Sequence, residues 1–270
     1  MTSLTSFSGS VPQNYETYLG PLFFEPYALD LAERLPDKEN MRNVLEIACG
    51  TGRLTNHLTA NLSPDVKLVA TDLNPDMLKV AEQIISAGNV QWQIADAHKL
   101  PFENKAFDAV VCQYGVMFFQ DKSKAFDEIN RVLKPGGVFL FNTWDELKYN
   151  ALAGMAQTVL EELYPNDPPH FLDKGPYSFF NKTQIKTLLT GAGLSEIHIE
   201  VVAKTTMAAN PDDAVTGILE GTPNYAYIAQ RNLPVTIVKE KLKVRLVHGF
   251  GEKNLPLPMQ ALVVEAKKSE

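Results

Sequence analysis

The stretch that most limits how this chain can fold is an apolar strand that runs directly into a glycine-rich turn. Residues 44–49 read Val-Leu-Glu-Ile-Ala-Cys, and residues 50–53 read Gly-Thr-Gly-Arg. Glycine has no Cβ, so it adopts unusual backbone angles and lets a ligand come close to the main chain. Leu54, Leu58 and Leu62 follow at helical spacing. The pattern predicts a strand, a ligand-binding turn and a helix whose free N–H groups face the ligand. A tight turn that binds nothing is the alternative.

Composition and charge favour a globular protein that acts on a small molecule. A chain of 270 residues with 45% hydrophobic content is sufficient for a packed interior. The net charge of −7 argues against binding to nucleic acid, which needs a concentrated basic face. Cys49 and Cys112 both lie in or at the end of apolar strands, which is typical of buried thiols in a reducing compartment. Residues 1–10 lack the features of a signal sequence, and no stretch is apolar enough to span a membrane. We therefore expect a cytoplasmic protein without membrane insertion, and the oligomeric state stays open.

Strands and helices alternate along the first half of the chain. Further apolar runs at residues 66–72, 90–94, 107–112 and 138–143 are separated by amphipathic helical segments. Alternation at these lengths is typical of βαβ units and predicts an α/β fold with a parallel sheet. Ligands of such sheets bind at the carboxyl ends of the strands.

Two acidic side chains lie at that edge of the predicted sheet. Asp72 ends the second strand about twenty positions after the glycines, where a carboxylate can accept hydrogen bonds from ribose hydroxyls. Asp96 follows the third strand. The alternative for Asp72 is a helix-capping or loop aspartate, which is weakened because Asn74 already supplies an N-cap. The glycines and the two acids together predict a nucleoside-binding site.

The sequence outside the strand-helix alternation suggests added segments. Aromatic residues cluster between Tyr15 and Leu35, where Pro21 and Pro26 predict short helical pieces, and about fifty residues separate the last two expected strands, far more than a hairpin needs. The expected organisation is an N-terminal lid or flank (1–35), a cofactor-binding core (36–145), a substrate loop with the end of the core sheet (146–203), a helical cap insertion (204–258), and a final strand and tail (259–270).

Taken together, the motifs resemble those of the class I S-adenosylmethionine-dependent methyltransferases. They are Glu46 to Gly52, Asp72, Ala95-Asp96-Ala97, Leu100-Pro101-Phe102 and Arg131 to Gly137. Within that class the chain is similar to the type 11 small-molecule group, which includes the ubiquinone and menaquinone biosynthesis methyltransferases. The resemblance covers residues 12–145 closely and 176–203 more weakly. It implies a Rossmann-like seven-stranded sheet that is mostly parallel, has helices on both faces and ends in an antiparallel strand. The implied cofactor is S-adenosylmethionine, with S-adenosylhomocysteine as product.

The resemblance also implies which residues contact the cofactor. Asp72 would accept the ribose hydroxyls, Asp96 would accept the adenine amino group, and Glu46 would orient the glycine turn from beneath. Residues in or near the glycine turn and the methionine part would be Tyr15, Glu46, Ala48, Gly50, Thr51, Gly52, Arg53 and Gln113. Residues at the nucleoside part would be Asp72, Leu73, Met77, Asp96 and Ala97.

Methyl transfer from a sulfonium is an in-line displacement, so holding the reactants in line supplies much of the catalysis. A base is needed only if the nucleophile must lose a proton. His170 and Asp145 are candidates for that base by position, and a structural role is the alternative for each. No His, Cys and carboxylate residues recur at metal-ligand spacing, so we expect no metal. The N-terminal aromatic residues and the segments 165–176 and 223–227 predict a pocket for a small, partly hydrophobic acceptor.

Two other functions stay open from the residues alone. An NAD-type oxidoreductase also places an acid after the second strand, but the third glycine of its G-x-G-x-x-G motif would fall at Thr55. A protein of this fold that binds the cofactor without catalysis is the other alternative.

Overall fold

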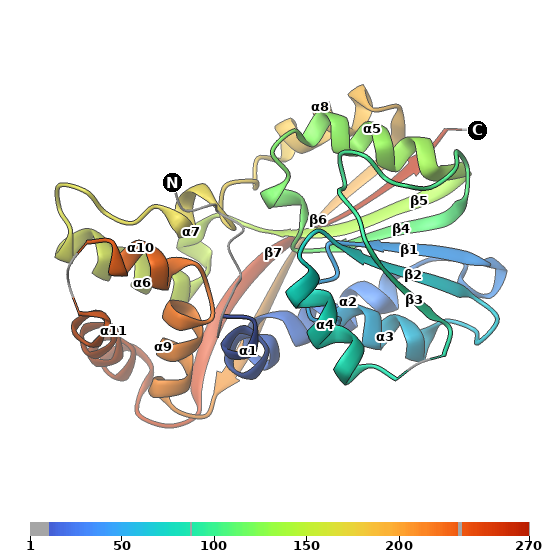
Figure 1. The fold of residues 1–270 in the computed structure, drawn as a ribbon. Helices are drawn as coiled ribbons and strands as arrows, with labels where there is room; N and C mark the ends of the chain where they lie inside the picture. Colours follow the sequence, from blue (N-terminus) through green and yellow to red (C-terminus); the bar gives the residue numbers. More distant parts are fainter. Residues whose placement is uncertain (1–10, 87, 232–233, 270) are drawn as a thin grey trace. The chain divides into compact units, whose positions relative to one another are not determined.

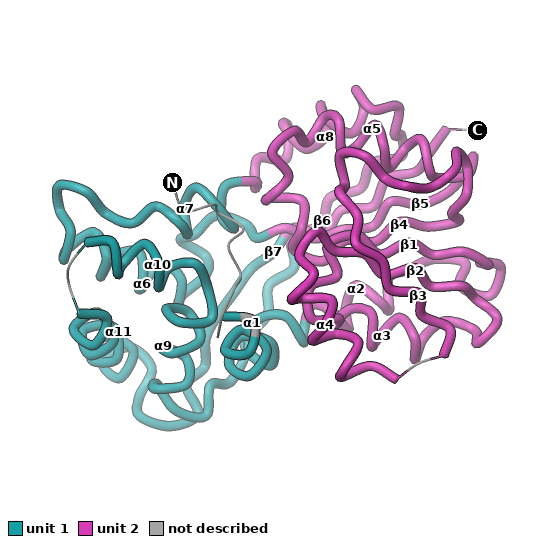
Figure 2. Tube along the Cα trace, viewed as in Figure 1, with its two compact units in different colours: residues 1–26, 144–178, 202–261 teal, residues 27–143, 179–201, 262–270 magenta. Residues whose placement is uncertain are grey.

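The chain forms two compact units, each built from three separate stretches of sequence (Figures 1 and 2). The structure is a computed structural model that describes residues 11–86, 88–231 and 234–269. Unit 1 contains residues 1–26, 144–178 and 202–261, and unit 2 contains residues 27–143, 179–201 and 262–270. The first ten residues of the expected N-terminal flank lie outside the described residues.

A seven-stranded sheet organises the fold and confirms the predicted class. Its strand order is β3-β2-β1-β4-β5-β7-β6, and the sheet is mostly parallel. The strands are β1 (Asn43–Ile47), β2 (Lys67–Asp72), β3 (Val90–Ile94), β4 (Phe107–Gln113), β5 (Leu133–Trp144), β6 (Leu194–Ala208) and β7 (Leu255–Lys268). Strands β1 to β5 pair in parallel. Because β1 and β4 are buried on both sides, they read as continuous apolar runs in the sequence.

Helices cover both faces of the sheet in unit 2. They are α2 (Glu25–Arg34), α3 (Arg53–Asn61), α4 (Pro75–Ile84), α5 (Lys122–Val132) and α8 (Lys182–Gly191), with short 3-10 turns at Lys38–Asn40 and Val116–Phe118. Figure 1 shows α2, α3 and α4 on one face and α5 and α8 on the other. Asn74 forms the predicted N-cap of α4, since its Oδ1 accepts from Asp76 N–H at 2.9 Å. Asn181 caps α8 in the same way, with Oδ1 accepting from Gln184 N–H at 3.0 Å.

Strand β5 begins five residues earlier than the apolar run at 138–143 indicates. Phe107 pairs with Leu133, whereas Ala109 pairs with Val138, so three more residues separate the partners on β5 than on β4. The segment Lys134-Pro135-Gly136-Gly137 forms this irregularity, and Gly136 adopts a φ of 74°. Gly136 and Gly137 thus lie in a bulge inside the strand and not in a loop before it.

The last two strands are also longer than their apolar cores at 197–201 and 261–266. Asn254 N–H donates to Ala209 O at 3.1 Å, and Ser195 Oγ donates to Lys267 O at 3.4 Å. The end of β6 therefore lies beside the start of β7, so the final strand runs antiparallel to its neighbour, as predicted. Buried and exposed residues alternate along much of β6, which places charged side chains within the strand.

Unit 1 is mainly helical. Its elements are α1 (Val11–Asn14), the π-helix η1 (Tyr15–Phe24), η4 (Leu147–Tyr149), α6 (Ala151–Leu163), α7 (Phe171–Lys174), α9 (Pro211–Glu220), α10 (Asn224–Ala229) and α11 (Val235–Phe250). Helix α9 packs against η1, α6 and α11. The expected break at Pro21 is wrong, because Pro21 lies inside η1. Pro26 lies in the first turn of α2, which continues η1 without a break, so neither proline ends the helical run.

Candidate functional site

The glycine loop, defined here as residues 48–52 after β1, contains three left-handed residues. The φ angles are 53° at Ala48, 57° at Gly50 and 85° at Gly52. A Cβ on Gly50 would meet no atom within 4 Å, so the space above this residue is open. A Cβ on Gly52 would lie 2.6 Å from Ile85 Cδ1. Gly52 therefore permits close packing, whereas Gly50 exposes the main chain to a ligand.

Asp72, at the end of β2, is bonded directly to this loop. Gly50 N–H donates to Asp72 Oδ2 at 2.8 Å, and Asn74 N–H donates to Asp72 Oδ1 at 2.8 Å. Burial raises the pKa of Asp72, and these N–H groups oppose that effect. Each carboxylate oxygen has two lone pairs, so both can accept a further hydrogen bond. The structure thus joins the loop and the acid, 22 residues apart, into one arrangement.

Glu46 lies beneath the glycine loop with no exposed surface. Its Oε2 accepts from Thr55 Oγ1 at 2.6 Å, and its main-chain oxygen accepts from Thr71 Oγ1 at 2.9 Å. Its Oε1 has no hydrogen-bond partner among the residues that the structure describes. Burial is the main cause that raises the pKa of Glu46 to about 8. Burial therefore favours the protonated form of this carboxyl group.

Asp96 is exposed and is held by His98. Its Oδ1 accepts from His98 N–H at 2.9 Å and lies 2.6 Å from His98 Nδ1. His98 Nε2 accepts from Asp121 N–H at 3.2 Å, so Nδ1 carries the ring proton and donates to Asp96. The hydrogen bond from His98 N–H is the main cause that lowers the pKa of Asp96. Oδ2 is left facing away from these bonds and can accept from a ligand.

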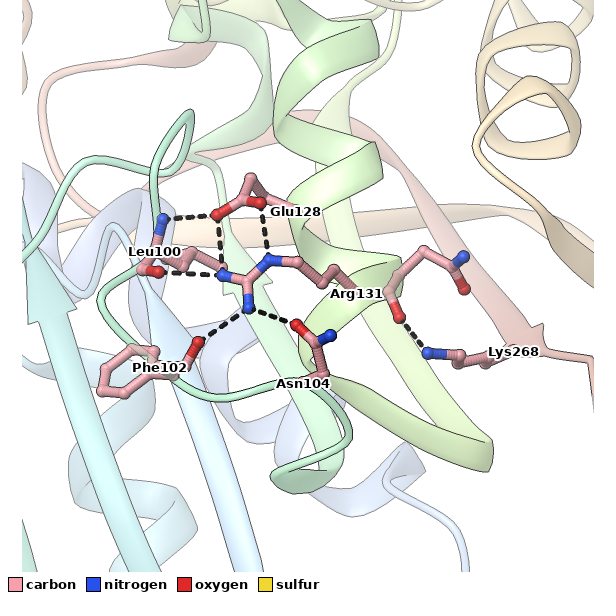
Figure 3. A network of polar contacts seen from close by, with 7 residues as sticks. Leu100, Phe102, Asn104, Glu128, Arg131 and Lys268 are labelled. Carbon is pink, nitrogen blue, oxygen red and sulfur yellow. Dashed lines mark hydrogen bonds and ion pairs between the residues drawn. The ribbon is translucent and has the colours of Figure 1, made fainter.

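An arginine on α5 holds the loop that follows Asp96 (Figure 3). Arg131 donates from Nη1 to Phe102 O at 2.7 Å and Asn104 Oδ1 at 2.9 Å, and from Nη2 to Leu100 O at 2.9 Å. It also donates to both Glu128 oxygens, at 2.7 and 2.9 Å, while Leu100 N–H donates to Glu128 Oε2 at 2.8 Å. All five N–H groups of the guanidinium are used. We call these five residues the arginine clamp. Its bonds join the Leu100-Pro101-Phe102 motif to the motif that begins at Arg131.

The end of β4 forms a strained turn against the glycine loop. Gln113 pairs with Asn142 of β5, and Tyr114 has a φ of 51°. Tyr114 N–H donates to Asn142 Oδ1 at 2.9 Å. A Cβ on Gly115 would lie 2.5 Å from Ala48 Cβ, so this turn and the glycine loop are in contact. Sequence reasoning did not select Asn142, although it is a polar residue that directly follows the apolar run of residues 138–141.

The other predicted contacts in unit 2 lie near these groups along the chain. Leu73, directly after Asp72, is 61% exposed, whereas Met77 is buried in α4. Thr51 is buried, Arg53 begins α3, and Ala97 directly follows Asp96.

Three predicted residues belong to unit 1. The Tyr15 ring stacks on Phe24 with centroids 4.6 Å apart. His170 Nδ1 lies 2.9 Å from Asp173 Oδ2. Asp145 Oδ1 accepts from Glu146 N–H at 2.8 Å, and its Oδ2 accepts from Gln260 Nε2 at 2.7 Å. Both Asp145 oxygens are therefore used within unit 1.

Two further findings concern only residues 11–86, 88–231 and 234–269. No group of three or more His, Cys, Asp or Glu side chains in this part of the chain could hold a metal ion. None of its helices combines the length and the apolar character needed to cross a membrane.

The chain is similar in sequence to proteins named as methyltransferases and shares its fold with solved methyltransferase structures. A family model described as a methyltransferase domain matches residues 45–141. The ubiquinone/menaquinone biosynthesis C-methyltransferase UbiE of Hahella chejuensis is 30% identical over 177 residues, covering 58% of this chain and 70% of that protein. The UbiE protein of Idiomarina loihiensis is 30% identical over 170 residues, covering 57% of this chain and 66% of that protein. The chain thus spans about two thirds of the length of these relatives. A structure of Haemonchus contortus phosphoethanolamine N-methyltransferase 2 with S-adenosyl-L-methionine shares the fold at a TM-score of 0.64 and 18% identity, covering 100% of this chain and 61% of that one.

Proposed function

The chain belongs to the S-adenosylmethionine-dependent methyltransferases of the UbiE-like type, and we propose that it transfers the methyl group of that cofactor to a small, partly hydrophobic organic acceptor. The observation that carries this proposal is the hydrogen bond from Gly50 N–H to Asp72 Oδ2 at 2.8 Å. It fixes an open glycine turn and a carboxylate at the same edge of the sheet, where a cofactor with a ribose and an amino-acid part needs both.

The residues present fit the cofactor. The open space at Gly50 admits the methionine part against the main chain. Asp72 has lone pairs left for the two ribose hydroxyls, a charge-assisted contact that a neutral side chain makes less well. The exposed Leu73 side chain offers an apolar surface for one face of the adenine, and Asp96 Oδ2 can accept from the adenine amino group.

When bound, the cofactor supplies a methyl group on a positively charged sulfur, which is already activated for displacement. The protein therefore has to hold the acceptor atom and the methyl group in line and exclude water. If the acceptor must lose a proton, His170 is better suited than Asp145. Asp173 holds Nδ1 of His170, whose partly exposed ring can then present Nε2 as a base, whereas Asp145 is buried.

We propose that the N-terminal flank and the cap insertion together bind the acceptor. Both contribute to unit 1, where a Cβ on Gly221 of the insertion would lie 3.1 Å from Tyr15 N. The Phe171 and Tyr227 rings, from the two loop segments expected in the acceptor pocket, have centroids 6.3 Å apart. Aromatic walls of this kind suit a partly hydrophobic acceptor.

An NAD-type oxidoreductase is not favoured. The position that would need a third glycine is Thr55, which is fully buried and hydrogen-bonded to Glu46. In that motif the third glycine lets the helix pack closely on the strand, whereas here a threonine side chain bonded to a buried acid fills the position.

Two measurements test the proposal. Calorimetric titration should give saturable binding of S-adenosylmethionine and no saturable binding of NAD or NADH; the opposite result overturns it. A screen for transfer of labelled methyl groups from the cofactor to a metabolite extract should then label at least one small molecule. Binding without any labelled product would support a protein of this fold that lacks catalysis.

A further inference from the structure

Asn142, two residues before the end of β5, carries a hydrogen-bond donor that the described residues leave unused. Its side chain has no exposed surface. Its Oδ1 accepts from Tyr114 N–H at 2.9 Å, while its Nδ2 has no hydrogen-bond partner in the described part of the chain. Tyr114 N–H can only donate, so it fixes the orientation of the amide with the oxygen toward Tyr114. The unused group is therefore the NH2.

The hydrogen bond from Tyr114 N–H uses only the oxygen of the Asn142 amide. A buried amide donor without a partner costs about 1–3 kcal/mol. Residues 138–141 are Val, Phe, Leu and Phe, so the strand otherwise fills its interior with apolar side chains. A buried amide among these apolar residues is stable only if both its oxygen and its NH2 have hydrogen-bond partners. A bound ligand can supply the partner for the NH2.

The strand order locates that partner. Three strand spacings separate β2 from β5 through β1 and β4. At about 4.8 Å per spacing, Asn142 lies roughly 14 Å across the sheet from Asp72. Asp72 is the proposed ribose partner, so Asn142 lies beyond the nucleoside on the side of the glycine loop. The contact between Gly115 and Ala48 joins its hydrogen-bonded turn to that loop.

We propose that Asn142 contacts the bound reactants, with Nδ2 donating to an oxygen at the methionine end of the site. That oxygen belongs either to the carboxylate of the cofactor's methionine part or to the methyl acceptor. Both sources present the same chemistry, a hydrogen-bond-accepting oxygen, and the ribose oxygens are too distant. This inference rests on the proposed function.

The Asn142→Asp variant tests the donor, because it keeps the oxygen that Tyr114 N–H needs and replaces only the NH2. Binding is measured by calorimetry with S-adenosylhomocysteine and with 5′-methylthioadenosine, which lacks the amino-acid part. If the partner is the carboxylate, the variant should bind S-adenosylhomocysteine at least tenfold more weakly and 5′-methylthioadenosine within twofold of the wild type. If the partner is the acceptor, both affinities should stay within twofold and labelled methyl transfer to the metabolite extract should fall at least tenfold.

Two further variants keep the test decisive. A buried aspartic acid can retain its proton and donate, so Asn142→Ala is measured in parallel, since its methyl group can neither donate nor accept. Asn130→Asp is the matched control, because Asn130 lies on α5 beside Arg131 of the arginine clamp, where a substitution is expected to alter stability and not affinity; it should bind both compounds as the wild type does.

The inference is overturned if both Asn142 variants bind both compounds and transfer label as the wild type does. It is also overturned if both compounds lose affinity equally, because that result means a collapsed turn and a purely structural role. If the wild-type chain binds neither compound, the proposed function itself has failed, and the two failures are thereby distinguished.

Discussion

Two loops at the carboxyl edge of the sheet in unit 2 are held in opposite ways. The arginine clamp uses all five guanidinium N–H groups to hold the loop between Asp96 and β4 (Figure 3). Beneath the glycine loop, Glu46 is fully buried with one oxygen unpartnered among the described residues, and burial raises the pKa of Asp72. A satisfied network stabilises the fold, whereas incompletely paired buried acids retain capacity for a ligand at a cost in stability. Changes in the clamp should therefore lower stability, whereas changes in the buried acids at the glycine loop should alter binding or remove a cost in stability.

The largest expected effect is a change in pH dependence in Glu46→Gln. Burial raises the pKa of Glu46 to about 8, so the native chain keeps a proton that the unfolded chain releases above its ordinary pKa. The free energy of unfolding should therefore fall as pH rises toward 8 and level off above it. Between pH 5 and pH 8 this group should cost the wild type roughly 3 kcal/mol, and the glutamine variant should lack that loss.

Urea denaturation of both proteins at pH 5 and pH 8 measures this difference. Other titrating groups contribute equally to the two chains and cancel in the comparison. If the free energy of unfolding changes equally with pH in the two proteins, Glu46 is ionised in the native state. The glycine loop would then carry no buried neutral acid that distinguishes it from the clamped loop.

The next effect, on stability alone, is expected in Arg131→Met. The substitution leaves Glu128 and the carbonyls of Leu100 and Phe102 without their donor, and hydrogen bonds to charged groups contribute about 1.5–3 kcal/mol. The free energy of unfolding should fall by about 2–3 kcal/mol, while affinity for S-adenosylhomocysteine should change less than threefold.

Arg34→Met is the matched control for that substitution. Arg34 also forms two ion pairs, with Asp30 and Glu200, each at 2.7 Å. The Arg34 side chain is as exposed as that of Arg131, but it donates only to carboxylates and to no loop carbonyl, so its loss should cost at most about 1 kcal/mol. Equal losses in the two variants would mean that the clamp is an ordinary surface ion pair.

Asp72→Ala should show the reverse pattern, with weaker binding and little change in stability. Loss of the charge-assisted contacts to the ribose should weaken cofactor binding by about 1–3 kcal/mol. The free energy of unfolding should change by less, because the substitution also removes a buried carboxyl whose pKa burial raises. Calorimetry and urea denaturation measure the two quantities. An unchanged affinity would mean that the ribose lies elsewhere.

The sequence predicts what depends on neighbours along the chain. The N-caps at Asn74 and Asn181 and the strand ends at Asp72 and Ile94 form where local patterns place them. The bulge at 134–137 is different, because its glycines are compatible with a turn before the strand as well as with a bulge inside it. Only the pairing with β4 decides between the two structures.

Contacts between distant residues could not be predicted in this way. The arginine clamp joins residues 27 to 31 positions apart, and a lone arginine near a helix end is compatible with many partners. Asn142 and Tyr114 are 28 positions apart, and nothing in either residue indicates the other. Strand β6 has ten residues beyond the apolar core at 197–201, and the sequence does not indicate them because polar residues alternate there.

The smallest effect is expected in Asp96→Ala. Asp96 precedes the loop that the arginine clamp holds, yet it is the proposed partner of the adenine, so this variant tests whether a residue beside the clamped loop can affect binding. The Asp96 carboxylate is exposed, so loss of one hydrogen bond should weaken S-adenosylhomocysteine binding by only about 1 kcal/mol. S-inosylhomocysteine carries an oxygen in place of the amino group, so its affinity should not fall. The pKa of Asp96 is lowered by His98 N–H, which keeps the carboxylate charged at pH 5. The affinity difference between the wild type and Asp96→Ala should therefore be the same at pH 5 and pH 8, unlike the pH-dependent stability effect of Glu46. A loss of affinity for both compounds would instead show that Asp96 supports the loop and does not recognise the base.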